Sequence, residues 1–279
     1  MGVQGKLTKD SFGYSVPVDA PLYEPFPLHY EDVTIMMFPY VTTAEASAKL
    51  LPSQLELAPV PGDASGTLAA AVMVFAHYGF STVGSYNEVA QTVACIYKGS
   101  DPALAGKPVS YAVRLHVDND MAMAAGREIG GFPKKLGRIA FNTAPIYAAT
   151  LESPEGIRIC SGEMHAYAKV AEQKDLPPAL QQQVLPYLSL RVIPDPASVA
   201  PPFKPSLCQL IYTEWVLEQG TFWSARGKLA FTGASALNPY DALPVVMQAP
   251  PMSFPANPIG TALFRGRMSI GQVRVLESL

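Results

Sequence analysis

The chain has 279 residues, of which 49% are hydrophobic, 10% aromatic and 15% charged, and its formal net charge is −3. This composition is typical of a globular protein and excludes general disorder. The longest apolar run, Leu68 to Ala76, is much shorter than the ~20 residues of a membrane-spanning helix, so we expect no membrane partner. Basic residues cluster only at Lys134 and Lys135, which excludes nucleic acid as a partner.

Three further observations concern location and metal binding. The first ten residues contain Lys6 and Lys9 but no apolar core, so they are not a secretory signal, and we expect a cytoplasmic protein. An odd number of scattered cysteines among apolar neighbours predicts buried thiols at Cys95, Cys160 and Cys208. The histidines have no metal-ligand spacing and predict no metal site; they are His29, His77, His116 and His165.

Short segments between 27 prolines and 21 glycines mostly alternate in hydrophobicity, which predicts a chain that is mainly β with short helices. The expected strands are Leu68–Ala76, Tyr111–Val117, Arg138–Phe141, Met164–Val170, Leu188–Ile193, Leu207–Trp215 and Lys228–Phe231. The expected helices are Thr43–Leu51, Asp120–Glu128 and Pro177–Leu185. In the strand Tyr111–Val117, alternation directs Leu115 to one face and Arg114 and His116 to the other.

We expect residues 1–20 to be an N-terminal extension and residues 21–279 to form a single β domain. The proline-rich stretches Pro194–Pro205 and Pro244–Pro258 are flanked by strand-like sequence, so they are predicted to be loops rather than linkers. Closing the sheet removes the free edges of so many strands, which favours a closed or nearly closed β domain.

The segment Gly126–Gly137 places two adjacent lysines behind a proline and two glycines. Pro133 favours an extended Phe132, which ends the preceding helix and leads Lys134 into a strand. Neighbouring strand residues face opposite sides, so one lysine faces the interior and the other the surface or a subunit contact. An amine buried among apolar side chains has a lowered pKa and becomes a nucleophile that forms Schiff bases. The alternative is that both lysines are solvated at a strand end.

This segment resembles the active-site segment of the acetoacetate decarboxylase family, and the resemblance extends over roughly Pro21 to Val246. Further stretches that resemble the family occur in the same order, at Leu50–Leu57, Tyr86–Glu88, Val117–Asn119, Leu190–Pro194, Cys208–Ile211, Trp223 and Ala242–Val245. The resemblance implies a closed, cone-shaped antiparallel β-barrel that assembles into homo-oligomers. It also implies that Lys134 forms the Schiff base, with Lys135 as its positively charged neighbour. No metal or organic cofactor is implied, because the imine itself accepts electrons.

Glu88 corresponds to the active-site glutamate of the family and is the only glutamate between Glu56 and Glu128. We therefore expect it to transfer protons, although an exposed carboxylate would explain the same sequence. Arg127 and Glu128 belong to the matched segment, but as neighbours of opposite charge they could equally form a structural ion pair.

The chain departs from the family where the substrate carboxylate is bound. The family has an arginine in its N-terminal segment, whereas this chain has no lysine or arginine from Asp10 through Ala48. The family also has a glutamate on an early strand, and Met73 takes that place in our alignment. We expect Arg114, His116 or Arg127 to bind a carboxylate if the chain decarboxylates a 3-oxo acid.

The sequence thus predicts a carbon–carbon lyase that binds a small oxo acid or ketone as a Schiff base. Two alternatives stay open: an aldolase-dehydratase that condenses pyruvate with an aldehyde, and a non-catalytic barrel that binds a hydrophobic carbonyl compound. Acetoacetate itself is expected to be a poor substrate, because its carboxylate would have no cationic partner.

Overall fold

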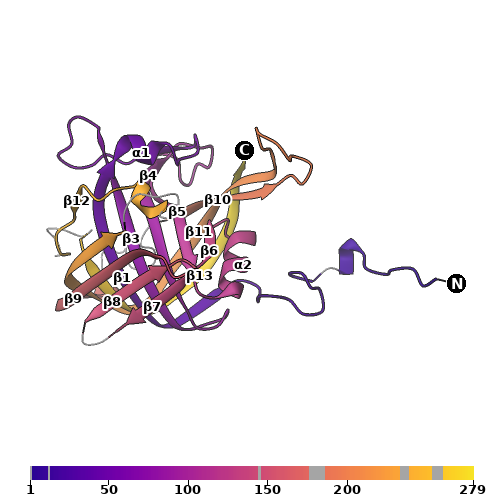
Figure 1. Cartoon of the computed structure of the whole chain (residues 1–279), viewed down its shortest axis with the longest axis horizontal. Coiled ribbons are helices and arrows are strands. Elements are labelled where there is room, and N and C mark those ends of the chain that lie inside the picture. The colour runs from indigo at the N-terminus through magenta and orange to yellow at the C-terminus, as the bar shows by residue number, and fades with distance from the viewer. Residues whose placement is uncertain (1, 12, 144–145, 176–185, 233–238, 253–259) are drawn as a thin grey trace.

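A computed structural model describes residues 2–11, 13–143, 146–175, 186–232, 239–252 and 260–279, and a sheet of 13 strands dominates it (Figure 1). The strands are Leu28–Thr43 (β1), Leu55–Leu57 (β2), Leu68–Ser81 (β3), Tyr86–Tyr97 (β4), Pro108–Val117 (β5), Lys134–Leu136 (β6), Arg138–Asn142 (β7), Tyr147–Glu152 (β8), Arg158–Glu172 (β9), Tyr187–Pro194 (β10), Pro205–Phe231 (β11), Met247–Gln248 (β12) and Ala262–Ser278 (β13). The α-helices are Ala44–Ala48 (α1) and Asp120–Glu128 (α2), and the 3-10 helices are Lys9–Ser11 (η1), Gln173–Asp175 (η2) and Pro239–Ala242 (η3).

The sheet closes on itself. Its strands follow the order β10, β5, β4, β3, β1, β13 and β11, and β11 pairs again with β10, so the ring has no free edge at this junction. This confirms the predicted mainly β, closed architecture. Two pairings are parallel rather than antiparallel, β5 with β6 and β5 with β10. The first is parallel because α2 carries the chain back along the sheet between β5 and β6.

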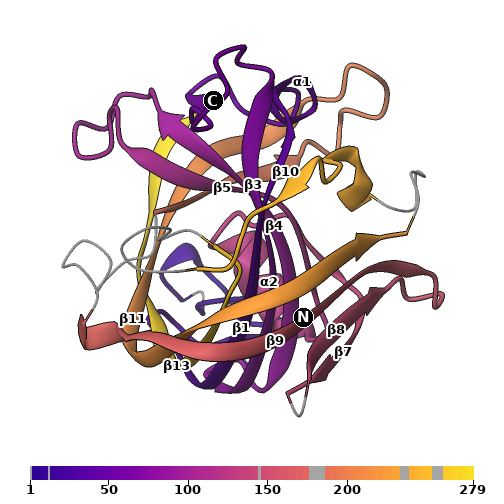
Figure 2. The same cartoon turned by 90° about the vertical axis from the view of Figure 1, so that its left-hand side faces the viewer.

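The two strands predicted at Leu207–Trp215 and Lys228–Phe231 are the ends of one strand of 27 residues, β11. Its first part pairs with β10 and its second part with β9, while β13 lies along its other side. Figure 2 shows β9 and β11 side by side across one side of the molecule, with β8 and β7 beyond β9. Register shifts along β11 let so long a strand coil around the ring.

The helix predicted at Asp120–Glu128 is confirmed as α2. Its N-cap is Asn119, whose side chain accepts a hydrogen bond from the backbone N–H of Ala122. The helix predicted at Thr43–Leu51 is shorter, because the chain continues beyond α1 as turns. The helix predicted at Pro177–Leu185 lies outside the described residues.

A bulge at Val113 breaks the alternation expected along β5. Thr92 of β4 pairs with Ala112, whereas the preceding Gln91 pairs with Arg114. As a result, Ala112 and Leu115 face the same interior cavity although they are three residues apart, and Arg114 lies on the opposite side of the sheet.

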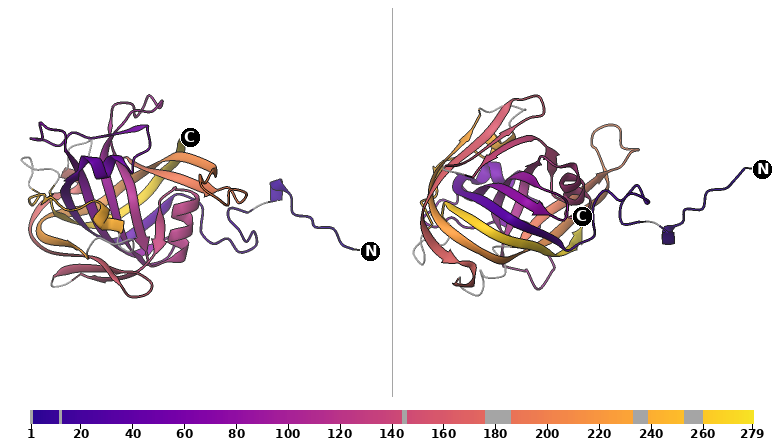
Figure 3. Two further views of the ribbon diagram at one scale, coloured as in Figure 1. Left: turned by 45° about the horizontal axis from the view of Figure 1, so that its top comes forward. Right: turned by 90° about the horizontal axis from the view of Figure 1, so that it is seen from below.

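The first residues of the chain run away from the closed sheet, as Figures 1 and 3 show from different sides. The chain is anchored where Tyr23 is buried and its hydroxyl donates a hydrogen bond to Glu128. The division into an extension and a single domain stays a prediction.

The stretch Pro194–Pro205 forms the loop between the paired strands β10 and β11, as predicted. None of the helices in the described part of the chain has the length and hydrophobicity to cross a membrane.

The turn from α2 to β6 requires glycine at position 131. Gly131 has a φ of +66°, and a Cβ there would lie 2.8 Å from the backbone nitrogen of Arg191 in β10. Gly131→Ala should therefore cost about 1 kcal/mol for the backbone conformation and about 1–3 kcal/mol more for the clash. The free energy of unfolding in denaturant measures both.

Gly106→Ala is the matched control, because Gly106 has a φ of +75° but no atom within 4 Å of an added Cβ. It should show the conformational cost alone. Equal losses of stability in the two variants would contradict close packing of the turn against β10.

Candidate active site

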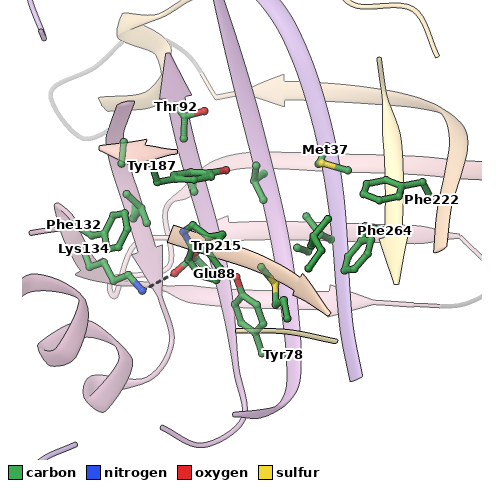
Figure 4. Close-up of a pocket in the computed structure, with 17 residues that line it drawn as sticks. Met37, Tyr78, Glu88, Thr92, Phe132, Lys134, Tyr187, Trp215, Phe222 and Phe264 are labelled. Carbon is green, nitrogen blue, oxygen red and sulfur yellow. Dashed lines mark ion pairs between the residues drawn. The ribbon is translucent and has the colours of Figure 1, made fainter. Parts of the chain in front are cut away.

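A buried ion pair joins β6 to β4 inside the ring. The Nζ atom of Lys134 lies 2.7 Å from Oε2 of Glu88, and the two side chains are only 7% and 6% exposed (Figure 4). Between their strands runs β5, which pairs with β6 on one side and with β4 on the other. Such a pair is costly to bury, so its presence in an apolar interior indicates a functional site.

The glycine-rich segment gives the Lys134 side chain its position. A Cβ at Gly126 in α2 would lie 2.6 Å from Cδ and 2.7 Å from Cε of Lys134, so only glycine leaves room for the lysine stem. The backbone N–H of Phe132 donates to the Gly126 carbonyl at 2.9 Å, and Arg127 Nη1 donates to the Lys134 carbonyl at 3.0 Å. The segment therefore fixes both ends of this lysine, its backbone and its amine.

Hydrogen bonds at the start of β4 hold the strand that contributes Glu88. Asp118 accepts one hydrogen bond from the backbone N–H of Asn87 and another from its side-chain amide, both at 2.7 Å. The Asn87 side-chain oxygen in turn lies 2.8 Å from Nδ1 of His77. The two sequence stretches that end at Glu88 and begin at Val117 thus meet, because these residues pair directly across β4 and β5.

Protonated phenols surround the carboxylate. Burial raises the pKa of Tyr78 well above its ordinary value, and the negative charge of Glu88 raises it further. The same two causes raise the pKa of Tyr187 to about 12. The Lys134 amine also lies 5.7 Å from the ring centroids of both Tyr86 and Phe132. Neutral aromatic groups therefore enclose the ion pair on several sides.

The pair opens into a cavity whose walls are almost entirely apolar (Figure 4). Glu88 and Lys134 are the only charged residues among its described lining. The other lining residues are Ile35, Met37, Val74, Tyr78, Ala90, Thr92, Ala112, Leu115, Phe132, Tyr187, Trp215, Leu217, Phe222, Phe264 and Met268. Among the described residues of the whole chain, no three His, Cys, Asp or Glu side chains gather as a metal site would require.

The two lysines face opposite sides, as expected for neighbouring strand residues. Lys134 is buried at the cavity, whereas Lys135 is exposed and its backbone pairs with His116 of β5. The structure thus does not bring the amine of Lys135 into the cavity. Its positive charge instead acts on His116.

Arg114 and His116 lie on the outer side of the sheet and do not line the cavity. Arg114 Nη1 donates to Gln91 Oε1 at 2.8 Å, and Nδ1 of His116 lies 2.9 Å from the hydroxyl of Tyr240. A Gln91 amide N–H also donates to the Tyr40 hydroxyl at 2.8 Å. The expected contact of Arg114 and His116 with substrate is therefore not supported, because the pleat of β5 directs both away from Lys134.

Met73 does not line the cavity either. It is fully buried on the outer side of β3 in a cluster with Phe38 and Phe75, and the next residue, Val74, faces the cavity in its place. Met73 and Val74 are neighbours in β3 and lie on opposite faces of the sheet, so the structure does not bring Met73 to the cavity.

Arg127 and Glu128 take separate partners rather than pairing with each other. Arg127 is exposed at the surface and donates a hydrogen bond to the backbone carbonyl of Lys134, and it does not line the cavity. The Glu128 carboxylate accepts the hydrogen bond from Tyr23, and its backbone carbonyl accepts one from Arg191 Nη1 at 2.9 Å. Sequence reasoning missed the aromatic walls, Tyr187 and Trp215 among them, because nothing in their local sequence distinguishes them from core residues.

The close approach of Gly126 to Lys134 predicts energetic coupling between the two. Gly126→Ala should destabilise the wild-type protein, because the new methyl group must displace the lysine stem from its carboxylate partner. In a Lys134→Ala background the same change should stabilise the protein by up to about 1 kcal/mol, the helix propensity difference between glycine and alanine. Unfolding free energies of the four proteins give the coupling energy. A coupling of zero would contradict this packing.

His116 should make stability depend on pH. Burial, together with the charge of Lys135, lowers the pKa of His116 to about 4, whereas the unfolded chain has the ordinary value of about 6.5. The unfolded state therefore binds this proton first, and stability is lost as the pH falls from about 6.5 towards about 4. The loss amounts to about 3 kcal/mol.

His116→Asn removes this titration and keeps a hydrogen-bonding atom for Tyr240. Between about pH 7 and pH 4, the free energy of unfolding in urea should fall by about 3 kcal/mol less for the variant than for the wild type. Parallel pH profiles would show that His116 is not buried in its neutral form.

Known proteins that resemble this chain share its fold along nearly the whole length. The family model for acetoacetate decarboxylase (ADC) matches residues 15–254. Decarboxylase DEC1 of Cochliobolus heterostrophus is 26% identical over 255 residues, which cover 88% of this chain and 91% of that protein. The crystal structure of acetoacetate decarboxylase from Legionella pneumophila has a TM-score of 0.73 at 19% identity, with coverage of 100% and 99%.

A second solved structure with this fold belongs to the enduracididine biosynthesis enzyme MppR. In that structure MppR is complexed with the condensation product of pyruvate and imidazole 4-carboxaldehyde. Its TM-score is 0.67 at 20% identity, and 99% of each chain is covered. Because the family model matches most of its length, this chain belongs to the acetoacetate decarboxylase family.

Proposed function

We propose that the chain is a carbon–carbon lyase that acts through a Schiff base on Lys134. The observation that carries this proposal is the buried contact of 2.7 Å between the Lys134 amine and the Glu88 carboxylate at the wall of an apolar cavity. The amine attacks the ketone carbon of an oxo compound, and loss of water gives the imine. The protonated imine then accepts the electron pair of the bond that breaks, which forms an enamine.

Glu88 accepts and donates the protons that these reaction steps require. In the contact with Lys134 it can accept a proton from the ammonium group, which leaves a neutral amine for attack without releasing charge into the apolar interior. The same group can later deliver a proton to the enamine carbon. Lys135 adds positive charge from the other side of the sheet and does not touch the substrate.

The lining of the cavity favours a neutral, hydrophobic oxo compound. Besides Lys134, no cation lies among its described lining residues, so a substrate carboxylate would be buried without a partner. That costs on the order of several kcal/mol, which makes acetoacetate a poor substrate. Each further methylene buried against the wall contributes about 0.8 kcal/mol, which favours a longer alkyl chain.

An aldolase-dehydratase is the second candidate, because the same imine can form a carbon–carbon bond and eliminate water. The fold shared with MppR, which holds the condensation product of pyruvate with an aldehyde, supports this candidate. A barrel that only binds a carbonyl compound is less well supported. Such a protein would gain nothing from a desolvated ion pair, which apolar residues replace at no loss of stability.

Borohydride reduction in the presence of heptan-2-one tests the Schiff base directly. The reduced adduct should appear on Lys134 in intact mass and peptide mapping, because Lys134 carries the only amine among the described residues that line the cavity. Lys134→Ala should give no adduct, and Lys135→Ala should keep it. An adduct on Lys135, or trapping that survives Lys134→Ala, would disprove the mechanism.

Glu88→Gln should separate trapping from proton transfer. The adduct on Lys134 should still form, while exchange of the ketone α-hydrogens for deuterium, followed by NMR in D2O, should slow by about 10² to 10⁴. A lower melting temperature with equal loss of both activities would assign Glu88 a structural role. No change in either activity would show that it is a bystander.

A further inference from the structure

Two residues of β11 that line a hollow beside Lys134 have buried polar groups with no hydrogen-bond partner among the described residues. These groups are the hydroxyl of Thr213 and the indole N–H of Trp215. Thr213 is completely buried, and the Nε1 atom of Trp215 has no contact with solvent. Buried donors without partners cost free energy and are rare in folded proteins, so each requires an explanation.

Both groups line a hollow directly beside the reactive amine. The lining of this hollow includes Tyr30, Tyr86, Gly126, Lys134, Thr213 and Trp215, together with mostly apolar neighbours. Trp215 and Lys134 also line the larger apolar cavity, so they stand where the two hollows meet. Figure 4 labels Trp215, Glu88 and Lys134 among the residues that line the larger cavity.

The backbone of β11 is irregular at this point. Between Thr213 and Trp215 the register with β13 shifts, from the Thr213–Val273 pair to the Trp215–Ile270 pair. A bulge re-aims side chains, and bulges occur preferentially next to active sites. Here it accompanies two donors that face one hollow, whereas the apolar strand residue Leu217 continues the wall of the larger cavity.

We propose that Thr213 and Trp215 bind a second, neutral oxygen of the substrate. This inference rests on the proposed Schiff base at Lys134. The substrate is then an oxo compound that carries a hydroxyl or a second carbonyl group in addition to the ketone that forms the imine. An indole N–H can only donate and a threonine hydroxyl can donate or accept, so together they suit one oxygen with free lone pairs.

The charge of the site decides between a neutral oxygen and a carboxylate. Neither donor carries charge, and Lys134 is neutralised by Glu88 or used in the imine. A carboxylate would therefore be only partly compensated in this interior, whereas a hydroxyl or carbonyl oxygen would be satisfied by two neutral donors.

Reductive trapping with three ketones of similar size tests this proposal. The probes are pentan-2-one, 4-hydroxypentan-2-one and 4-oxopentanoate, and the measured quantity is the concentration that gives half-maximal adduct on Lys134. The wild type should trap the hydroxyketone at about tenfold lower concentration than pentan-2-one, the effect of about one net hydrogen bond. It should trap 4-oxopentanoate less readily than the hydroxyketone.

Thr213→Val and Trp215→Phe remove the donors and keep the shape of the wall. Each should reduce the preference for the hydroxyketone over pentan-2-one several-fold, because the donor to the second oxygen is lost. Thr42→Val is the matched control, because Thr42 is also fully buried, its hydroxyl has no partner among the residues that the structure describes, and it does not line either hollow. It should retain the full preference.

Failure of this inference differs visibly from failure of the Schiff base. An adduct on Lys134 with no preference for the hydroxyketone, or with a preference for 4-oxopentanoate, would overturn the role of Thr213 and Trp215 alone. If the two variants trapped both neutral ketones equally poorly, these residues would have a structural role, and the inference would also be overturned. No adduct on Lys134 with any ketone would overturn the Schiff base and this inference together.

Discussion

The contact between Lys134 and Glu88 is the constraint on which the arrangement of the site depends. Removing an ammonium and a carboxylate from water costs several kcal/mol per ion, and only close, well-oriented contact in the low-dielectric interior offsets it. Their separation of 2.7 Å is therefore a structural requirement as much as a chemical one. Any displacement of either strand would leave two buried charges apart.

The surrounding structure meets this requirement through the backbone. The crossover through α2 lays β6 parallel to β5, which puts Lys134 opposite Leu115, and the antiparallel pairing of β5 with β4 brings Glu88 opposite Val117. Gly126 then leaves the space that the lysine stem occupies. The closed ring holds these strands in register, because a slip at one pairing would have to propagate around the whole sheet.

In the function that we propose, the walls of the cavity make the reaction of the Lys134 amine selective. Aromatic and aliphatic side chains exclude water, and the phenols near Glu88 stay protonated because burial raises their pKa. Polar recognition is then left to the few neutral donors that face the amine, Thr213 and Trp215 among them. A site built in this way discriminates by shape and by neutral hydrogen bonds rather than by charge.

Local chemistry in the sequence determined the helix α2, the turn behind it and the opposite orientations of Lys134 and Lys135. Asn119 caps the helix, glycine permits the turn, and Pro133 starts the strand, so these features need no distant contacts. The alternation of apolar residues likewise determined the mainly β architecture.

Only the tertiary structure decided which other side chains meet the amine. Val74 rather than Met73 faces the cavity because of strand register, and Arg114 and His116 are directed outward by the pleat of β5. Trp215 lines the same cavity as Lys134 because β11, far along the chain from β6, closes the ring against β10. Register, bulges and ring closure follow from pairings between distant strands, and no local pattern of residues specifies them.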